Sequence, residues 1–407
     1  MLSLVVNRMI NFNEPIDRMG TYSTQWDFMA DRFGASNILP FSISDMDLAI
    51  PNELVTIMKK RLEHPILGYS RWNHPEYLEA ITHWYRQRFE VEIEPEWLSY
   101  SPSVMYSLSK CIELLSQEQD EILLFTPAYN AFFDCITMNR RKVLCSNLIL
   151  ENQQYTIDWS DFEEKCRQAK IILLCNPHNP VGRVWQEWEL IKIIEIGKKN
   201  NCYIISDDIH MDIILEGTFY PLLKAKNYQH NIILLSSISK SFNVPALTGS
   251  YVIIPNEQLR KSFQVITRYR DFVNSPAVLN VLATIKAYQI GNEWLSELLD
   301  HIKRNLEIVT HFLKANIPEI KLIKPEGCYF AWLDCSELKI SSEKLQTLLI
   351  TIGKVGIMSG RTYGQTGENF LRLNIACSDI KLIDGLNRLK ITVEYIKAQK
   401  KRGENHG

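Results

Sequence analysis

Four short apolar runs in the middle of the chain are each followed by side chains that could do chemistry. The runs occupy residues 121–125, 171–175, 203–206 and 232–235. The groups after them are an aromatic ring, an amide, a carboxylate, an imidazole, hydroxyls and an amine, which belong to Tyr129, Asn176, Asp207, His210, Ser237, Ser239 and Lys240. In an open parallel sheet, ligands bind beyond the carboxyl ends of the strands. If the runs are parallel strands, all these groups meet at one edge of the sheet.

Such a set matches what pyridoxal phosphate requires of a protein. An amine such as Lys240 can form a Schiff base with the cofactor and, once the substrate displaces it, act as the general base at Cα. A carboxylate such as Asp207 can keep the pyridine nitrogen protonated, so that the ring acts as an electron sink. An aromatic face can stack on that ring, and an amide can hydrogen-bond its phenolic oxygen. The sequence therefore predicts an enzyme that carries pyridoxal 5'-phosphate on Lys240 and reacts at the α-carbon of an amino acid.

A site for the phosphate is predicted at the start of a helix. Residues 101–105 read Ser-Pro-Ser-Val-Met and precede an amphipathic stretch, 106–115. Backbone N–H groups at a helix start, together with hydroxyls, are a ready-made site for phosphate. Ser103 could equally be a plain N-cap, a position that serine favours, and the sequence leaves both readings open.

The order of apolar segments predicts an α/β fold. Two further apolar runs, 142–144 and 250–254, join the four above, and amphipathic stretches such as 188–199 lie between runs. This alternation is typical of a mainly parallel sheet with crossover helices. The link from 235 to 250 contains Pro245 and is too short for a crossover helix. The last strand should therefore run antiparallel to the one before it.

The pattern becomes helical in the last third of the chain. Helices are predicted at 257–267, 278–288 and 294–315, and strands at 329–333 and 370–375. These segments are the natural material for a second, smaller domain.

The chain length predicts two domains, because a single core usually stops growing at roughly 250–300 residues and this chain has 407. We expect a large cofactor-binding domain over 51–290. A smaller α+β domain should combine 1–50 with 291–395. The basic polar tail, 396–407, is expected to be disordered.

Composition argues against several classes of protein. A net charge of -2 and a pI near 6.5 offer no attraction for nucleic acid or an anionic membrane. No apolar run approaches the roughly 20 residues that span a bilayer. The nine cysteines are odd in number and never spaced as C-x-x-C, which disfavours both a disulfide framework and a metal site. A reducing, cytoplasmic setting is expected.

Several motifs together resemble a known family. They are SISKSFN around Lys240, CNPHNPVGR at 175–183, SDDIH at 206–210 and FLRLNIAC at 370–377. These resemble fold-type I pyridoxal-phosphate enzymes of the aminotransferase class I/II superfamily, and within it the MalY/PatB group of cystathionine β-lyase-like carbon–sulfur lyases. The resemblance begins at DRMGTYSTQWDF near residue 17 and reaches the Leu386 region. It implies a large domain with a mainly parallel sheet, a smaller α+β domain, and a homodimer that shares its active sites.

The resemblance also implies a role for each site residue. Lys240 forms the internal aldimine, Asp207 pairs with the pyridine nitrogen, and Tyr129 stacks on the ring. The remaining roles are contacts to the phenolic oxygen by His210 and Asn176, contacts to the phosphate by Val104, Met105, Ser237 and Ser239, and a further phosphate contact by Tyr69 from the neighbouring subunit. Arg372 would bind the substrate α-carboxylate as a bidentate fork.

Plainer roles remain open for four of these residues. Asp207 could cap a helix, His210 could be a structural histidine, Tyr129 could be ordinary core, and Arg372 could form a surface ion pair. The place of Arg372 inside an apolar strand pattern argues against the last of these.

The residue at position 248 bears on the type of reaction. Many aminotransferases of the superfamily carry an arginine eight positions after the lysine, where it grips the phosphate; here that position is Thr248. The lyase-like group also lacks this arginine. We therefore expect elimination of a thiol from cysteine S-conjugates, with pyruvate and ammonia as the other products. The alternatives are an aminotransferase and, from another class, a protein of the same fold with a regulatory binding role.

The chain departs from the pattern of the group in three places. The group usually reads W-V-A-D-M-D-F where this chain has Ser42-Ile43-Ser44-Asp45-Met46-Asp47-Leu48. Since that segment lies near the substrate in relatives, the loss of the tryptophan leaves the substrate preference open. Asp208 stands in place of a glutamate. Ser103 replaces a glycine, which would matter if that position required a positive φ.

Overall fold

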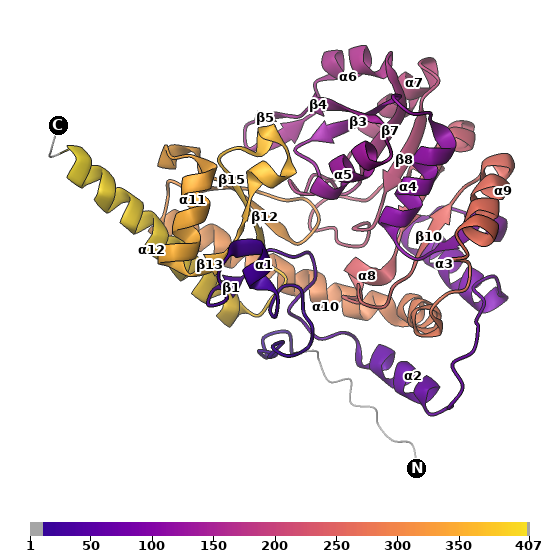
Figure 1. Ribbon diagram of the computed structural model, residues 1–407, viewed down its shortest axis with the longest axis horizontal. Helices are drawn as coiled ribbons and strands as arrows, with labels where there is room; N and C mark the ends of the chain where they lie inside the picture. The colour runs from indigo at the N-terminus through magenta and orange to yellow at the C-terminus, as the bar shows by residue number, and fades with distance from the viewer. Residues whose placement is uncertain (1–10, 405–407) are drawn as a thin grey trace.

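Seven strands form the central sheet of the computed structural model, which describes residues 11–404 (Figure 1). In spatial order they are β2 (Leu98–Ser101), β10 (Ser250–Ile253), β9 (Ile232–Ser236), β8 (Tyr203–Asp207), β7 (Ala169–Cys175), β3 (Glu121–Thr126) and β4 (Lys142–Asn147). The five strands from β9 to β4 are parallel. β10 is antiparallel to β9, as predicted, and β2 is antiparallel to β10. β2 was missed because its sequence, Leu-Ser-Tyr-Ser, has no apolar run.

The sheet is apolar on both faces because helices cover both. Ile122 and Leu124 of β3 belong to one hydrophobic cluster, and the alternate residues Leu123 and Phe125 belong to the other. Strands buried on both faces read as continuous apolar runs, which is why the sequence revealed them. The helices of this domain are α2 (Asn52–Leu62), α3 (Pro75–Phe89), α4 (Val104–Leu115), α5 (Asn130–Met138), α6 (Trp159–Cys166), α7 (Glu187–Lys199), α8 (Ile238–Ser241) and α9 (Glu257–Val265). A hairpin, β5 (Ile149–Glu151) and β6 (Gln154–Thr156), lies outside the sheet.

The smaller domain lies beside the large sheet (Figure 1). Its four-stranded antiparallel sheet has the order β11 (Lys321–Ile323), β12 (Phe330–Asp334), β15 (Phe370–Asn374) and β14 (Met358–Ser359). Its other elements include α1 (Met29–Phe33), α11 (Ser342–Leu348) and α12 (Asp379–Glu404). β1 (Leu39–Pro40) pairs in parallel with β13 (Val355–Gly356). This pairing attaches the N-terminal segment to the C-terminal part of the chain.

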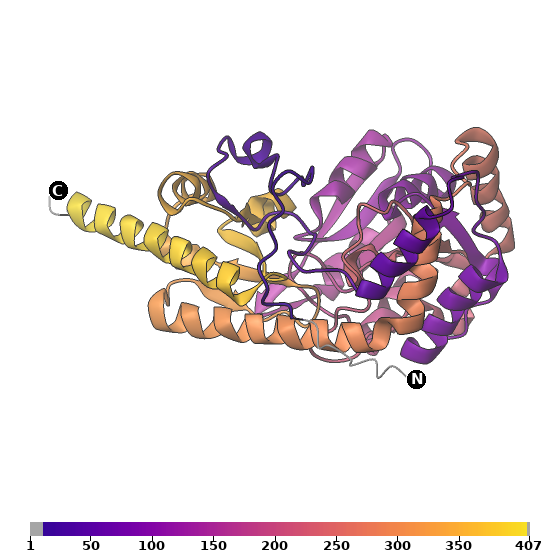
Figure 2. The same cartoon turned by 90° about the horizontal axis from the view of Figure 1, so that it is seen from below.

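One long helix replaces two predicted ones. The segments 278–288 and 294–315 form a continuous helix, α10 (Val278–Asn316), which runs along both domains (Figure 2). Gly291 lies between the two predicted segments. Here the glycine serves packing, because a β-carbon at this position would lie 2.6 Å from Phe242 Cζ and 2.8 Å from Trp84. The predicted boundary at 290 therefore falls within a helix, and the division into 51–290 and 1–50 with 291–395 stays a proposal.

The prediction of a disordered tail was wrong for residues 396–404. They are the last turns of α12, which projects from the small domain (Figure 2). Ile396 is buried, and the Lys400 amine donates to the Leu338 carbonyl over 2.6 Å. Lysine and arginine are good helix formers, and their charge is favourable near a helix C-terminus. Residues 405–407 lie outside the described part of the chain. Within residues 11–404, no helix is long and apolar enough to cross a bilayer.

Candidate active site

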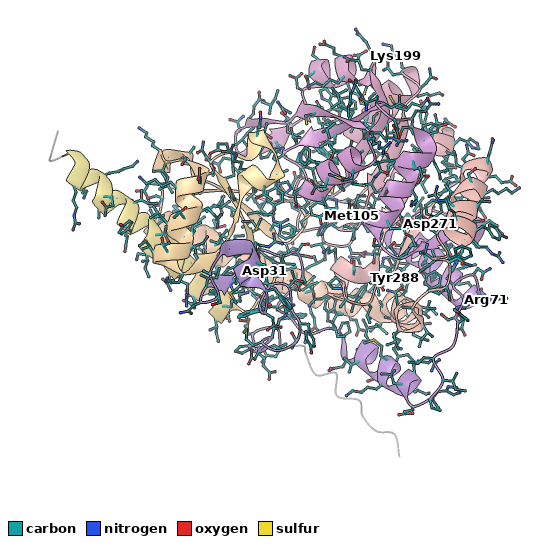
Figure 3. The ribbon with its side chains drawn as sticks, in the orientation of Figure 1. Asp31, Arg71, Met105, Lys199, Asp271 and Tyr288 are labelled. Atoms are coloured by element: carbon teal, nitrogen blue, oxygen red, sulfur yellow. The ribbon has the colours of Figure 1, made fainter. Side chains whose placement is uncertain are left out.

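A cavity of about 210 Å³ lies at the carboxyl ends of β7, β8 and β9 and at the start of α4. In Figure 3, Met105 marks the end of α4 that borders this cavity, whereas Lys199 marks the opposite edge of the sheet. The cavity lining includes nearly all the residues predicted for the cofactor, which are Val104, Met105, Tyr129, Asp207, His210, Ser237, Ser239 and Lys240. The fold thus brings together groups that are up to 136 residues apart, from Val104 to Lys240.

Lys240 sits in the short helix α8, directly after β9. Its amine donates hydrogen bonds to the backbone oxygen of Ser44 at 2.8 Å and to Ser44 Oγ at 2.9 Å. The pKa of this amine is lowered to about 8, chiefly by burial; Arg372 acts in the same direction, whereas Asp45 and Asp207 oppose the change. About a tenth of the amine is therefore neutral at pH 7, far more than for a lysine of ordinary pKa, and only the neutral form can act as a nucleophile or a base.

Asp207 is the last residue of β8. One carboxylate oxygen accepts a hydrogen bond from the Ile209 N–H over 3.1 Å. No helix begins after it, so the capping role does not apply. Burial raises the pKa of Asp207 to about 6, against the opposing effects of the Ile209 N–H and of Lys240. The carboxylate is ionised at neutral pH and faces the cavity, where a cationic partner would relieve the cost of its burial.

His210 is buried against two aromatic rings. The ring centroids of Tyr329 and Phe330 lie 5.5 Å and 5.8 Å from that of the imidazole. Burial lowers the pKa of His210 well below its usual value, and Lys240 and Arg372 act in the same direction. The imidazole is therefore neutral. Among the described residues, its Nδ1 has no hydrogen-bond partner, which suits a ligand more than a satisfied structural histidine.

Tyr129 stands at the N-cap of α5 and is half-buried. Its ring meets Phe132 edge-on at 5.4 Å, and another part of it lines the cavity. Burial raises the pKa of the phenol. The Tyr129 ring therefore packs against the core on one side and lines the cavity on the other, where it is available to a planar ligand.

The start of α4 has the form of an anion site. The amides of Val104 and Met105 belong to the first helical residues, which have no acceptor within a helix, and the helix dipole favours negative charge here. Ser103 is the N-cap and accepts from the Tyr106 N–H at 3.1 Å. Its φ is -159°, an extended conformation that any residue adopts. The replacement of glycine by Ser103 therefore causes no strain.

Ser237 and Ser239 approach the same end of the cavity from α8. The Ser237 hydroxyl caps α8 by accepting from the Ser239 N–H at 3.1 Å, and it donates to the Gly249 carbonyl at 2.8 Å. Ser237 thereby holds the loop that carries Thr248, which also lines the cavity.

Arg372 is buried in β15, so a surface ion pair is excluded. Its guanidinium donates to Asn179 Oδ1 and to the Ser42 carbonyl, each over 3.0 Å. Nε has no partner among the described residues. The rings of Phe330 and Tyr363 lie 4.1 Å and 4.7 Å from the guanidinium carbon. A buried, incompletely paired guanidinium beside the cavity is suited to a carboxylate.

The structure does not bring Asn176 to the cavity. Its side-chain oxygen accepts from the Trp185 backbone N–H over 3.3 Å. Its backbone N–H donates to the Asp207 carbonyl, so Asn176 extends the pairing of β7 with β8 by one hydrogen bond. Asn179, three residues further, lines the cavity and contacts Arg372. Within the Asn176-Pro177-His178-Asn179 stretch, the cavity of this structure favours Asn179 over Asn176 as the contact to a ligand. Asn176 directly follows the last residue of β7, and its side chain accepts from Trp185 instead.

Tyr69 is fully exposed and does not line the cavity of its own chain, which is compatible with the predicted contact to a neighbouring subunit. Ser44, read from the sequence only as a departure from a family pattern, contacts the Lys240 amine.

Comparison with known proteins agrees with this geometry. The family model described as aminotransferase class I and II matches residues 36–389. The chain belongs to this family. Within the class I/II family, the chain is 39% identical to Protein MalY of Escherichia coli, over 93% of this chain and 97% of that protein. It is 33% identical to cystathionine beta-lyase PatB of Bacillus subtilis, over 94% and 99% respectively.

Two solved structures share the fold over most of the chain. A PLP-bound C-S lyase from Staphylococcus hominis has a TM-score of 0.89 and 30% identity, covering 96% of this chain and 99% of that one. A PLP-bound putative aminotransferase from Clostridium difficile has a TM-score of 0.92 and 35% identity, covering 94% and 100%.

Proposed function

We propose that this protein is a pyridoxal-phosphate-dependent carbon–sulfur β-lyase that converts cysteine S-conjugates to a thiol, pyruvate and ammonia. The observation that carries the proposal is the cavity itself, in which an amine of lowered pKa, an ionised carboxylate and the start of α4 face one space. Relatives whose names include cystathionine beta-lyase and C-S lyase, at 30–33% identity, support the same reaction.

The residues fit the cofactor. The phosphate would be held by the amides of Val104 and Met105 and by hydroxyls of α8, and the pyridine nitrogen by Asp207. His210 and Asn179, in place of Asn176, would contact the phenolic oxygen, and Tyr129 would stack on the ring. When bound to Lys240, pyridoxal phosphate supplies an electron sink for the negative charge that develops at the substrate Cα.

The protein's own part of the chemistry is binding and proton transfer. Arg372 would bind the α-carboxylate and fix which substrate bond faces Lys240. The neutral Lys240 amine would remove the Cα proton. If Cβ bears sulfur, the electrons of the broken C–H bond are used to expel the thiolate. Thr248 leaves the phosphate without the arginine typical of many aminotransferases.

Pyruvate release tests the proposal directly. With S-alkyl cysteines or cystathionine and no added keto acid, we expect one pyruvate for each substrate consumed, measured by a coupled dehydrogenase assay. Omission of the keto acid is the control, because an aminotransferase needs that second substrate. Amino transfer to a keto acid without release of pyruvate would support the second candidate, an aminotransferase, which the likeness to the Clostridium difficile structure favours.

We further propose a homodimer in which Tyr69 completes the phosphate site of the partner. Tyr69 has 101% relative exposure and is accompanied by the exposed apolar residues Ile66, Leu67 and Phe272. Clusters of exposed apolar side chains mark protein interfaces. The nine cysteines are all free thiols, which supports the cytoplasm as the compartment.

Sedimentation and cofactor titration test this arrangement. We expect the protein to sediment at twice its mass of 47.3 kDa. Tyr69→Phe, which removes only the hydroxyl, should leave the dimer intact and weaken cofactor binding about tenfold. Tyr22→Phe is a matched control, since Tyr22 is also highly exposed. A fully active monomer, or equal effects of the two substitutions, would contradict the proposal.

A further inference from the structure

The segment 42–48 forms a bridge between the two cationic groups of the site. At one end the Ser42 carbonyl accepts from Arg372. Two residues further, Ser44 accepts twice from the Lys240 amine, once through its carbonyl and once through its hydroxyl. Ser44 also lines the cavity. A single stretch of backbone therefore contacts both the residue that would bind the substrate carboxylate and the residue that would move the proton.

Side chains on both sides of Ser44 hold the segment in place. Asn374 donates to the carbonyls of Ile43 and Asp45, each over 2.7 Å. The Met46 N–H donates to Asn243 Oδ1 at 2.9 Å, and Arg18 pairs with Asp45 at 2.6 Å. The backbone is thus fixed immediately before and after Ser44. A side chain held in one position can orient its hydrogen-bond partner, because little conformational entropy is then lost when the reacting groups come together.

The number of acceptors on Ser44 matches the number of N–H bonds in a neutral amine. Neutral Lys240 has two N–H groups and one lone pair, and the two groups have two acceptors on Ser44 at 2.8 Å and 2.9 Å. We propose that Ser44 is a positioning residue that accepts hydrogen bonds from both N–H groups of Lys240. The lone pair of the Lys240 nitrogen is then left free to point towards a reactant. In the proton transfer, that lone pair forms the new N–H bond, and the electrons of the broken C–H bond stay on the substrate carbon.

The charged and titratable groups around Lys240 do not perform this task. Asp45, Asp207, Arg372 and His210 act on the amine through their charge or proximity, whereas its hydrogen bonds go to Ser44. A carboxylate in place of Ser44 would stabilise the ammonium form and remove the lone pair. A hydroxyl and a carbonyl are neutral, so they orient the amine while it stays a base. The inference rests on the proposed role of Lys240 but not on the identity of the leaving group.

Three substitutions at Ser44 separate the hydroxyl from the shape of the side chain. Ser44→Ala removes the acceptor, Ser44→Cys replaces it with a weak one of similar shape, and Ser44→Thr retains it. The first readout is the exchange of the Cα proton of L-alanine in D₂O, followed by NMR with the holoenzyme. Alanine has no leaving group, and lyases and aminotransferases both perform this exchange. Failure of the lyase assignment would thus leave the test intact.

The second readout is the rate at which the cofactor-free full chain takes up pyridoxal phosphate, measured by visible absorbance as a function of pH. In Ser44→Ala and Ser44→Cys we expect exchange and the limiting uptake rate to fall about tenfold. The pH midpoint of uptake should fall by about one unit, because the ammonium form loses an acceptor. A purely structural role would reduce the amount of active protein without moving the midpoint. Ser44→Thr should resemble the unsubstituted protein in both readouts.

Ser116→Ala is the matched control. The Ser116 hydroxyl also accepts from a cation, Arg141 Nε at 2.9 Å, but it lies at the far end of α4. We expect no change in exchange or in the uptake midpoint. If Ser44→Ala does not fold, Ser44→Cys decides the question. Unchanged exchange and midpoint in folded Ser44→Ala or Ser44→Cys, or equal losses in Ser44→Thr and Ser44→Ala, would overturn the proposal.

Discussion

Replacement of Lys240 by alanine is expected to abolish the visible absorbance of lysine-bound pyridoxal phosphate and to lower pyruvate release by at least about 10⁴-fold. The physical reason is that one amine performs two tasks, since it anchors the cofactor and removes the Cα proton, and each task alone contributes about 10²-fold or more. Its pKa of about 8 provides neutral amine at working pH. Absorbance spectra and the pyruvate assay measure the two effects separately.

Lys165→Ala is a suitable control for Lys240→Ala. Lys165 is also partly buried, but its amine pairs with Asp161 at 2.6 Å in α6. It should retain full absorbance and activity. Pyruvate release by Lys240→Ala at an undiminished rate would contradict the assigned role. A cellular phenotype that persists in Lys240→Ala would favour the alternative of a regulatory binding role for this fold.

Asp207→Asn is expected to lower activity by about 10³-fold or more and to remove the pH dependence of cofactor binding. An ionised carboxylate stabilises a protonated pyridine nitrogen, and an amide of the same shape does not. The pKa of Asp207 is raised to about 6 by burial, so the carboxylate loses its charge as the pH falls through this value. Because a cationic partner favours the ionised form, cofactor affinity of the unsubstituted protein should fall below pH 6.

The neighbouring Asp208 provides the control for Asp207. Its carboxyl is also buried, but it does not line the cavity, and one of its oxygens accepts from the Ser206 hydroxyl. Burial raises its pKa to about 8, so it is already largely protonated at neutral pH. Asp208→Asn should therefore retain cofactor affinity and its decline below pH 6, as measured by equilibrium titration. Equal effects of the two substitutions would contradict the assignment of Asp207.

Much of the site could be inferred from the sequence because residues that follow different parallel strands lie close together at the same edge of the sheet. A residue that follows an apolar strand lies at the carboxyl edge of the sheet whatever the crossover helix contains. Asp207 and Lys240 were found in this way, and Tyr129 and His210 as well. The antiparallel course of β10 followed from the short link alone.

Three features of the structure could not be predicted from the sequence. The two helices predicted at 278–288 and 294–315 are one helix, α10, in which Gly291 packs against Trp84 and Phe242, and these residues are far apart in the sequence. The choice between Asn176 and Asn179 could not be made from the sequence, because it depends on the Asn176 side chain accepting from the Trp185 N–H instead of facing the cavity. The helical state of residues 396–404 depended on packing of Ile396 that composition does not reveal.

The chemistry could be predicted from the sequence alone, because an amine and a carboxylate that follow parallel strands meet at one edge of the sheet. How that chemistry is supported depends on contacts between distant parts of the chain. Arg372 reaches the site from the small domain, and Ser44 contacts Lys240 across 196 residues of chain. Such contacts arise where two domains close on each other, and no periodicity along the chain records which residues meet there.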